Sequence, residues 1–178
     1  LNAFNLFDGI NLQLSIYTIL IILYLLTLDS SHSVVSILLF PLFFFALLNY
    51  KNSAILGDSG SLTLGFLISY LIIKYYKFSD DLMADHIFIL LMIPGIDMLR
   101  LFIFRASMGK SPFYGDHNHI HHIIHKKLSL YKTLLVLHGI FLFLIFSLMY
   151  KLNSLLLITV YIVFYISIIK YFQIKVND

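Results

Sequence analysis

Long runs of apolar residues constrain the fold of this chain more than any other feature. A helix needs about 20 apolar residues to cross a bilayer, with a range of about 17 to 25. Length and the lack of alternation favour helices over buried strands. We therefore predict an all-α fold, a polytopic transmembrane helix bundle with about six membrane helices. The predicted spans are Leu12–Leu28, Val34–Leu48, Leu62–Tyr76, His86–Phe104, Leu130–Tyr150 and Ser154–Phe172.

Composition supports a membrane protein. Hydrophobic residues make up 60% of the chain and charged residues only 12%, whereas about a quarter of a soluble domain is charged. No repeat or low-complexity linker divides the chain, so we expect a single integral membrane domain over residues 1–178. The chain starts at Leu1 and carries no secretory signal, and we interpret it as the C-terminal part of a longer protein. The absence of cysteine excludes disulfides and thiolate metal sites.

Positive charges indicate how the spans are oriented. Six spans would place Leu1–Asn11, Asn49–Gly60, Arg105–Ser129 and the C-terminus on one side of the membrane. Of the 12 Lys and Arg residues, all but three lie on that side or at its span ends. The positive-inside rule then predicts that this side faces the cytoplasm, together with the aspartates and histidines that its loops carry.

The stretch from Gly57 to Ser61, Gly-Asp-Ser-Gly-Ser, puts the Asp58 carboxylate at the mouth of an apolar run. A charge in that position is costly and usually functional. Glycines and hydroxyls around it suit a backbone that approaches an anion or a metal closely. The alternative is a helix N-cap at Asp58 or Ser59, for a helix that begins near Ser61.

The polar segment Asn2–Asn11 leads directly into the first span. If it is helical, Asn5 and Asp8 share a face, and Asn11 continues that face. Amide and carboxylate groups would then grip a polar ligand or a metal together. The alternative is a polar helix entry with Asp8-Gly9 as a plain turn.

The densest polar segment runs from Lys110 to His122. A proline and a glycine break any helix before Asp116. Beyond that point, helical spacing would align Asp116, His119 and His122 along one stripe. Such a stripe suits a divalent metal, or a diphosphate to which nearby lysines add positive charge. The alternative is a surface histidine-rich loop with incidental metal affinity.

The segment Pro94-Gly95-Ile96-Asp97 is followed by Arg100 and Arg105. Asp97 and Arg100 are three positions apart, a spacing at which a helix brings opposite charges together. We expect a structural ion pair here rather than part of a ligand site.

Together these segments resemble the polyprenyl-phosphate N-acetylhexosamine-1-phosphate transferases of glycosyltransferase family 4. That family includes the enzymes that start O-antigen, enterobacterial common antigen and teichoic acid synthesis, and the related phospho-MurNAc-pentapeptide translocase. The matching segments follow in the family's order and cover nearly the whole chain. They are Asn2–Asn11 (N-A-x-N-x-x-D-G-I-D), Leu56–Gly65 (G-D-x-G-S-x-x-L-G), Pro94–Asp97 with Arg105 (P-x-x-D) and Ser111–His122 (S-P-x-x-x-D-x-x-H-x-H-H).

The resemblance implies a transferase that depends on Mg²⁺, with Mn²⁺ as a substitute, at the cytoplasmic face of the bacterial inner membrane. Undecaprenyl phosphate attacks the β-phosphate of a UDP-sugar, here UDP-GlcNAc, and UMP is released. The product would initiate a cell-surface polysaccharide such as the O-antigen of lipopolysaccharide, as one step of cell wall biogenesis. The expected partners are the UDP-sugar, undecaprenyl phosphate, the lipid bilayer and, as an open option, a second copy in a homodimer, but no nucleic acid.

The resemblance also implies roles for individual residues. Asp58 is the expected metal ligand, and Asp116 is expected to orient the histidines. The expected catalytic residues are Asp8, Asp116 and His119, and the expected substrate-binding residues are Asn5, Gly9, Asn11, His121, His122 and Lys110.

Two departures from the family pattern leave alternatives open. Asn11 stands where the pattern has a second aspartate, and an amide cannot accept a proton, so a non-catalytic relative is one alternative. The family's early Asp-Asp motif belongs to an N-terminal half that precedes these segments, so we expect this chain to be inactive alone. Within the family, the phospho-MurNAc-pentapeptide translocase branch is the other alternative.

Two rival hypotheses belong to other classes of protein. An intramembrane aspartyl protease also uses membrane aspartates near a Gly-Asp step, but it needs a further glycine where this chain has Ile55. It also leaves the histidines unexplained. A divalent-cation carrier would need polar residues in the middle of several spans, and these spans contain almost none.

Overall fold

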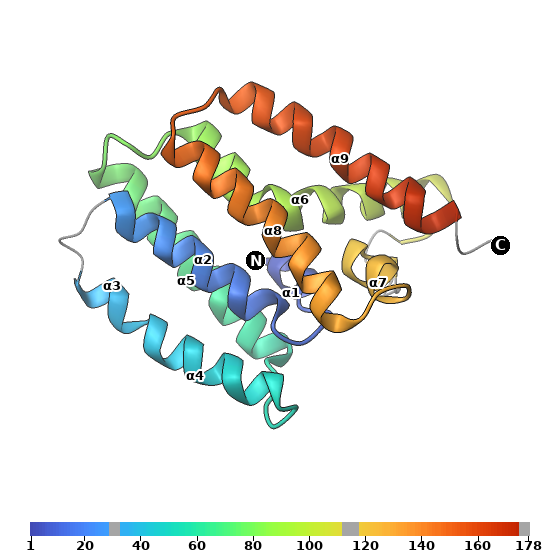
Figure 1. Ribbon diagram of the computed structural model, residues 1–178, viewed down its shortest axis with the longest axis horizontal. Coiled ribbons are helices and arrows are strands. Elements are labelled where there is room, and N and C mark those ends of the chain that lie inside the picture. The colour runs from blue at the N-terminus through green and yellow to red at the C-terminus, as the bar shows by residue number, and fades with distance from the viewer. Residues whose placement is uncertain (29–32, 112–117, 175–178) are drawn as a thin grey trace. The chain divides into compact units, whose positions relative to one another are not determined.

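The computed structural model describes residues 1–28, 33–111 and 118–174. Within these residues the regular structure is helical throughout and contains no strand, so the prediction of an all-α fold is confirmed (Figure 1). The helices are α1 (Asn2–Phe7), α2 (Gln13–Leu28), α3 (Ser33–Ile37), α4 (Leu39–Tyr50), α5 (Gly57–Phe78), α6 (Ala84–Ser107), α7 (Ile120–His125), α8 (Leu130–Met149) and α9 (Ser154–Ile174).

Three of these helices are long and apolar enough to cross a membrane, namely α6, α8 and the Ser154–Phe172 part of α9. Two apolar helices are shorter, α2 and the segment Val35–Tyr50. Although α5 has 22 residues, it belongs to neither group, and its glycines, serines and lysines lower its mean hydropathy. The six predicted runs are thus mainly helical, although Val34–Leu48 is divided between α3 and α4 at Leu38. The number that cross a bilayer stays a prediction.

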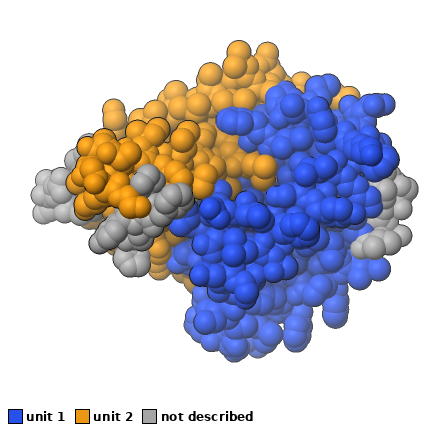
Figure 2. All heavy atoms as spheres, turned by 180° about the vertical axis from the view of Figure 1, so that it is seen from behind, with its two compact units in different colours: residues 1–90 blue, residues 91–178 orange. Residues whose placement is uncertain are grey.

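The internal contacts of the chain define two compact units, Leu1–Leu90 and Leu91–Asp178 (Figure 2). In the first unit α5 packs against α1 and α2, and α2 also packs against α4 (Figure 1). In the second unit α7 packs against α8 and α9, which contact each other. The division lies inside the continuous helix α6, and the prediction of a single membrane domain stays a prediction.

Tyr17 in α2 holds α1 within the first unit. Its side chain is only 1% exposed, and its hydroxyl donates a hydrogen bond to the Leu90 carbonyl at 2.5 Å. A buried hydroxyl is costly unless it is bonded in this way. The edges of the Phe4 and Phe7 rings pack against the Tyr17 ring, with centroids 6.0 and 5.1 Å away. These contacts anchor a six-residue helix that is too short to be stable alone.

Gly65 allows α1 to lie close to α5. A Cβ atom at this position would come within 3.3 Å of the Phe4 Cβ and 3.4 Å of the Leu1 Cα. Because glycine has no side chain, the two backbones can approach without displacing α1. This close packing brings Asn5 of α1 to the first turns of α5.

The helical face considered for the polar segment Asn2–Asn11 does not extend beyond α1. The first helix ends at Phe7, where the Asp8 N–H closes the last turn on the Asn5 and Phe4 carbonyls. Asn11 lies in a turn before α2, so Asp8 and Asn11 do not continue a helical face from Asn5. The chain leaves the helix here because Asp8-Gly9 makes a turn, as the alternative interpretation proposed.

Candidate functional site

The first group of predicted site residues meets where α1 and α5 come together. Asn5 Nδ2 donates hydrogen bonds to Asp58 Oδ1 at 3.0 Å and to the buried Ser61 Oγ at 2.9 Å. Ser61 Oγ in turn donates to the Asp58 carbonyl at 3.1 Å. These bonds join two motifs that lie 53 positions apart. We call Asn5, Asp8, Asp58 and Ser61 the Asp58 cluster.

Asp58 is exposed and lies in the first turn of α5. The helix begins one residue earlier, at Gly57, and no side chain caps it, so the alternative of an N-cap at Asp58 or Ser59 is wrong. Gly57 has a φ of +64°, a left-handed conformation that favours glycine. The carboxylate therefore stands at the positive end of a helix, where a negative charge is stabilised. Among the described residues, only Oδ1 of this carboxylate has a side-chain hydrogen bond.

Asp8 is half-buried and follows α1 directly. Burial, and then the negative charge of Asp58, raise the pKa of its carboxyl to about 6. The two carboxylates are therefore close enough to influence each other. Oxygen ligands of this kind suit Mg²⁺, which usually takes one or two carboxylates and completes its shell with water and substrate phosphates.

Nothing in the described part of the chain forms a metal cage made of protein groups alone. No set of three or more histidine and aspartate side chains is arranged there to hold a metal ion. The histidine-metal hypothesis gains no support from these residues. The oxygens of Asp58 and Asp8 suit a magnesium ion whose other ligands come from outside the protein.

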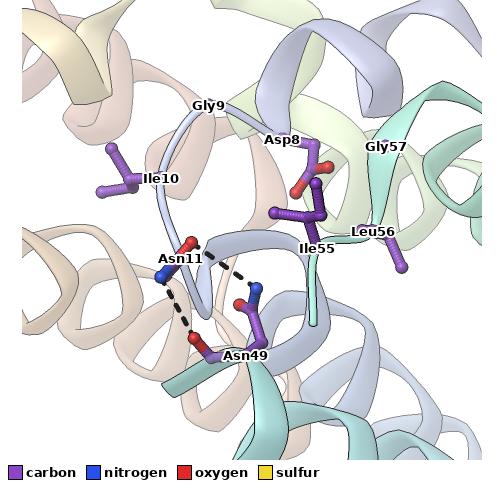
Figure 3. A pocket seen from close by; sticks show the side chains of 8 residues that line it. All are labelled: Asp8, Gly9, Ile10, Asn11, Asn49, Ile55, Leu56 and Gly57. Carbon is purple, nitrogen blue, oxygen red and sulfur yellow. Dashed lines mark hydrogen bonds between the residues drawn. The ribbon is translucent and has the colours of Figure 1, made fainter. Parts of the chain in front are cut away.

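A pocket of about 250 Å³ opens beside these carboxylates (Figure 3). It is lined on one side by residues 8–11, and on the other by Asn49 and residues 55–57. Gly9 is part of this lining, as the resemblance predicts for a substrate-binding residue. The pocket joins the segment that ends with Asn11 to the one that leads into Asp58.

A second cluster forms around Asp97 in the unit Leu91–Asp178. This carboxylate is 2% exposed, and its Oδ1 accepts hydrogen bonds from Arg100 Nη2 at 2.9 Å and the Tyr165 hydroxyl at 2.7 Å. Its Oδ2 lies 2.8 Å from His119 Nδ1. The Ile120 N–H contacts both oxygens, at 3.2 and 3.3 Å. We call Asp97, Arg100, His119 and Tyr165 the Asp97 cluster, and the predicted Asp97–Arg100 ion pair is confirmed.

Asp97 determines how the His119 ring is used. A carboxylate accepts hydrogen bonds, so the proton of a neutral His119 ring belongs on Nδ1, and Nε2 is left as an acceptor. Asp116, the residue predicted to orient the histidines, lies outside the described residues. The sequence indicates only a structural ion pair for Asp97 and no role for Tyr165. The Asp97–Arg100 spacing was the one available signal, since His119 and Tyr165 lie 22 and 68 positions away.

The remaining histidines of this segment have different surroundings. Because α7 begins at Ile120 and His119 is extended, the predicted helical stripe through His119 is wrong. The His121 ring is buried and stacks on His119 with centroids 5.5 Å apart, while His122 is half-buried. Burial, and then His122, lower the pKa of His121 to about 3, so His121 is uncharged at neutral pH.

Lys110, the remaining predicted binding residue, is exposed just beyond α6. The predicted site residues therefore form two groups, one in each unit. The first group is Asn5, Asp8, Gly9, Asn11 and Asp58, and the second is Lys110, His119, His121 and His122. The prediction that both groups face one ligand stays a prediction.

Comparison with known proteins identifies relatives of this chain. Residues 1–76 match the family model described as glycosyl transferase family 4. An undecaprenyl-phosphate alpha-N-acetylglucosaminyl 1-phosphate transferase of Thermotoga maritima is 30% identical over 154 residues, which cover 86% of this chain and 47% of the relative. The protein of the same name from Escherichia coli is 27% identical over 136 residues, 70% of this chain and 37% of the relative.

The chain thus spans about half the length, or less, of the curated relatives it matches. No solved structure matches it. The names of these relatives agree with the resemblance found in the four motifs, and neither rival class appears among them. The chain is similar to members of glycosyl transferase family 4, whose model its residues 1–76 match.

Proposed function

We propose that the protein containing this chain transfers GlcNAc-1-phosphate from UDP-GlcNAc to undecaprenyl phosphate. An oxygen of the lipid phosphate attacks the β-phosphorus of the donor. The bond from this phosphorus to the oxygen that bridges the two phosphates breaks, UMP leaves, and a lipid diphosphate sugar forms. The relatives that carry the name of this transfer support the proposal.

The observation that carries the proposal is the contact of Asn5 with Asp58 and Ser61 beside the pocket. Transfer between phosphates depends mainly on positioning and on neutralising negative charge. Asp58, with Asp8 close by, would hold the Mg²⁺ ion, and bound Mg²⁺ would neutralise and polarise the diphosphate. Asn5 keeps the Asp58 carboxylate in place while its second oxygen stays open to a ligand.

The Asp97 cluster supports a second part of the same chemistry. His119 presents Nε2 as an acceptor because Asp97 holds its Nδ1. Such a nitrogen is suited to take a proton from a phosphate and, once protonated, to donate a hydrogen bond to a phosphate oxygen. We assign His119 to the lipid phosphate or the donor diphosphate, and His122 and Lys110 to further contacts with these anions.

The proposed location is the cytoplasmic face of the bacterial inner membrane. The unequal distribution of lysines and arginines supports this orientation. UDP-sugars are cytoplasmic anions, and undecaprenyl phosphate is a membrane lipid, so the reaction requires a site at that interface. The product would serve as the first lipid-linked sugar of a cell-surface polysaccharide.

The test uses the complete open reading frame that encodes this chain, purified in detergent with added lipid. Labelled UDP-GlcNAc, undecaprenyl phosphate and Mg²⁺ are supplied, and UMP and labelled lipid are measured. We expect both products, their loss on addition of EDTA, and recovery with excess Mg²⁺ or Mn²⁺. UDP-MurNAc-pentapeptide is offered in parallel, and turnover with this donor alone would assign the protein to the translocase branch. Absence of UMP release from every UDP-sugar would overturn the proposal.

A further inference from the structure

Asn49, the buried residue near the end of α4, connects the two loops that line the pocket. Its Oδ1 accepts a hydrogen bond from the Leu12 N–H at 2.6 Å. Its Nδ2 donates to the Ala54 carbonyl at 2.8 Å and lies 3.5 Å from Asn11 Oδ1. The side chain is 6% exposed, so both of its polar atoms are used within the protein. One amide therefore joins the segment after α1 to the segment before α5.

Asn11 adds further bonds between the same two segments. Its Nδ2 donates to the Asn49 carbonyl at 3.0 Å and to Asn52 Oδ1 at 2.5 Å. Figure 3 shows the Asn11 side chain turned toward Asn49. We call Asn11, Asn49 and Asn52 the asparagine clamp. Each contact of Asn11 Nδ2 requires a donor, which the carboxylate of an aspartate cannot supply.

The backbone around the clamp depends on these bonds. Leu12 has a φ of +70° and Asn52 a φ of +56°, both in the left-handed region. Asparagine tolerates this region, whereas a leucine there is uncommon and strained by about 1–2 kcal/mol. The strain persists only where surrounding contacts hold it, and the bond from the Leu12 N–H to Asn49 is such a contact.

We propose that the asparagine clamp sets the spacing of the Asp8 and Asp58 carboxylates, and through it the affinity for the divalent cation. Asp8 lies three residues before Asn11, and Asp58 lies four residues after Ala54, where the clamp ends. The clamp residues are positioning residues, and Asn11 acts here through its bonds to the neighbouring loop. The inference rests on the proposed function for its effect on turnover, but the clamp itself is tested without turnover.

The clamp predicts an effect of Asn11→Asp that is opposite to the one the family motif suggests. Asn11→Asp would supply the aspartate of the family motif, yet it would place a negative charge against the Asn49 carbonyl and Asn52 Oδ1. We expect this substitution to lower kcat by about 10-fold or more, rather than to raise it. Unchanged or increased turnover in Asn11→Asp would contradict this expectation.

The first measurement reports the loop directly. This chain contains no cysteine. In the full protein, with any cysteine outside this chain replaced by serine, a nitroxide at Ser53→Cys, an exposed position inside the 51–56 loop, reports the order of that loop by electron paramagnetic resonance. Asn49→Leu removes all clamp bonds of that side chain without adding charge. We expect a mobile spectral component in this variant, and in Asn11→Ala if Asn49→Leu does not fold.

The second measurement is Mn²⁺ binding to the full protein, again by electron paramagnetic resonance. We expect Asn49→Leu and Asn11→Ala to bind Mn²⁺ at least about 10-fold more weakly and to need correspondingly more Mg²⁺ for half-maximal turnover. Loss of structure alone would lower the thermal midpoint and leave the Mg²⁺ requirement of the folded fraction unchanged. Unchanged loop spectra and Mn²⁺ affinity in these variants would overturn the clamp.

Two controls make the test specific. Asn153→Asp is the matched substitution, because within the described part of the chain Asn153 uses only its Oδ1, as acceptor for the Leu156 N–H at 3.1 Å, and an aspartate keeps that bond. We expect it to behave as the wild type. Asn52→Gly accepts the positive φ and removes the oxygen that faces Asn11. The loss caused by Asn11→Asp should therefore be smaller in the Asn52→Gly background, and equal losses in both backgrounds would oppose the proposal.

The outcomes also separate this inference from the proposed function. Spectral and Mn²⁺ changes as expected, in a protein without turnover on any UDP-sugar, would support the clamp and overturn the transferase proposal. Turnover with unaltered Mn²⁺ binding in the variants would support the transferase and overturn the clamp.

Discussion

Two aspartates of this protein show how differently one kind of side chain is used. Asp97 is 2% exposed and is surrounded by an arginine, a tyrosine, a histidine and a backbone N–H, which contact both of its oxygens. Asp58 is exposed and, from the residues that the structure describes, its carboxylate accepts one side-chain hydrogen bond, from Asn5. A buried charge must be paired and hydrogen-bonded, whereas an exposed carboxylate is stabilised by water and remains available to bind a ligand.

The same contrast extends to the groups that each carboxylate contacts. Asp97 orients His119, and the Tyr165 hydroxyl and Arg100 guanidinium support it from the same side. In the Asp58 cluster the order is reversed, since the Asn5 amide bonds the carboxylate itself. Ser61 in turn accepts a hydrogen bond from Asn5 and donates one to the Asp58 backbone carbonyl. A catalytic group is held best by a bonded supporting shell. Asp97 therefore positions another side chain, His119, whereas Asp58 is itself positioned by Asn5.

The largest effect is expected from a substitution that removes the central carboxylate of the Asp97 cluster. Asp97→Ala leaves Arg100 and the other donors without their shared acceptor, and removing one partner of a buried ion pair costs about 3–5 kcal/mol. We expect a fall of several degrees or more in the thermal unfolding midpoint of the detergent-purified protein. Asp80→Ala, at an exposed turn, is the control and should leave the midpoint unchanged. Equal midpoints for both variants would show that Asp97 is not structural.

The second largest effect is a loss of turnover with no loss of stability. Asp58→Asn retains an oxygen for the bond from Asn5 but loses the charge that Mg²⁺ requires. We expect turnover to fall at least about 100-fold, about 2.7 kcal/mol in the barrier, with an unchanged unfolding midpoint. UMP release and thermal unfolding are measured on the same sample, with Asp80→Asn as the matched variant. Retained turnover in Asp58→Asn would show that Asp58 is not a ligand of the proposed metal ion.

The pH dependence of stability tests the buried histidine beside the Asp97 cluster. The pKa of His121 is lowered to about 3 in the folded protein, against about 6.5 in an unfolded chain. As the pH falls below about 6.5, the unfolded state binds a proton that the folded state does not, so stability is lost. The loss between pH 7.5 and 5.5 is about 1.4 kcal/mol.

We therefore expect His121→Gln to reduce the acid sensitivity of the unfolding midpoint. His125→Gln, which changes an exposed histidine of the same helix, is the control and should retain the wild-type sensitivity. Identical pH dependence in the wild type and His121→Gln would show that His121 does not stay neutral in the folded protein.

The smallest effect tests how closely α1 packs against α5 at Gly65. Gly139→Ala, in α8, puts a methyl group into open space, and we expect a gain of about 0.5–1 kcal/mol from helix propensity. Gly65→Ala gains the same propensity but crowds Phe4 and Leu1. Its net gain should be smaller or negative, and its Mg²⁺ requirement higher because Asn5 shifts. A full gain at Gly65 in thermal unfolding would mean that α1 is not closely packed there.

Much of the Asp58 cluster was predictable, because each of its members lies in a recognisable motif. The contact of Asn5 with Asp58 follows the expectation that both motifs serve one site. The boundaries were less predictable, since the turn at Asp8 and the start of α5 at Gly57 depend on local backbone geometry. Asn49 and Asn52 were missed altogether, because an asparagine outside a motif gives no sign of what it contacts.

The amino-acid sequence alone determined that the chain is helical and apolar, which family it resembles, and which carboxylates are available for chemistry. These properties follow from composition, from the length of the apolar runs and from local motifs. Only the tertiary structure decided that Asp97 holds His119 and that Asn49 joins two loops. A hydrogen bond is satisfied by whichever donor packing brings within about 3 Å, and that choice depends on contacts far apart along the chain.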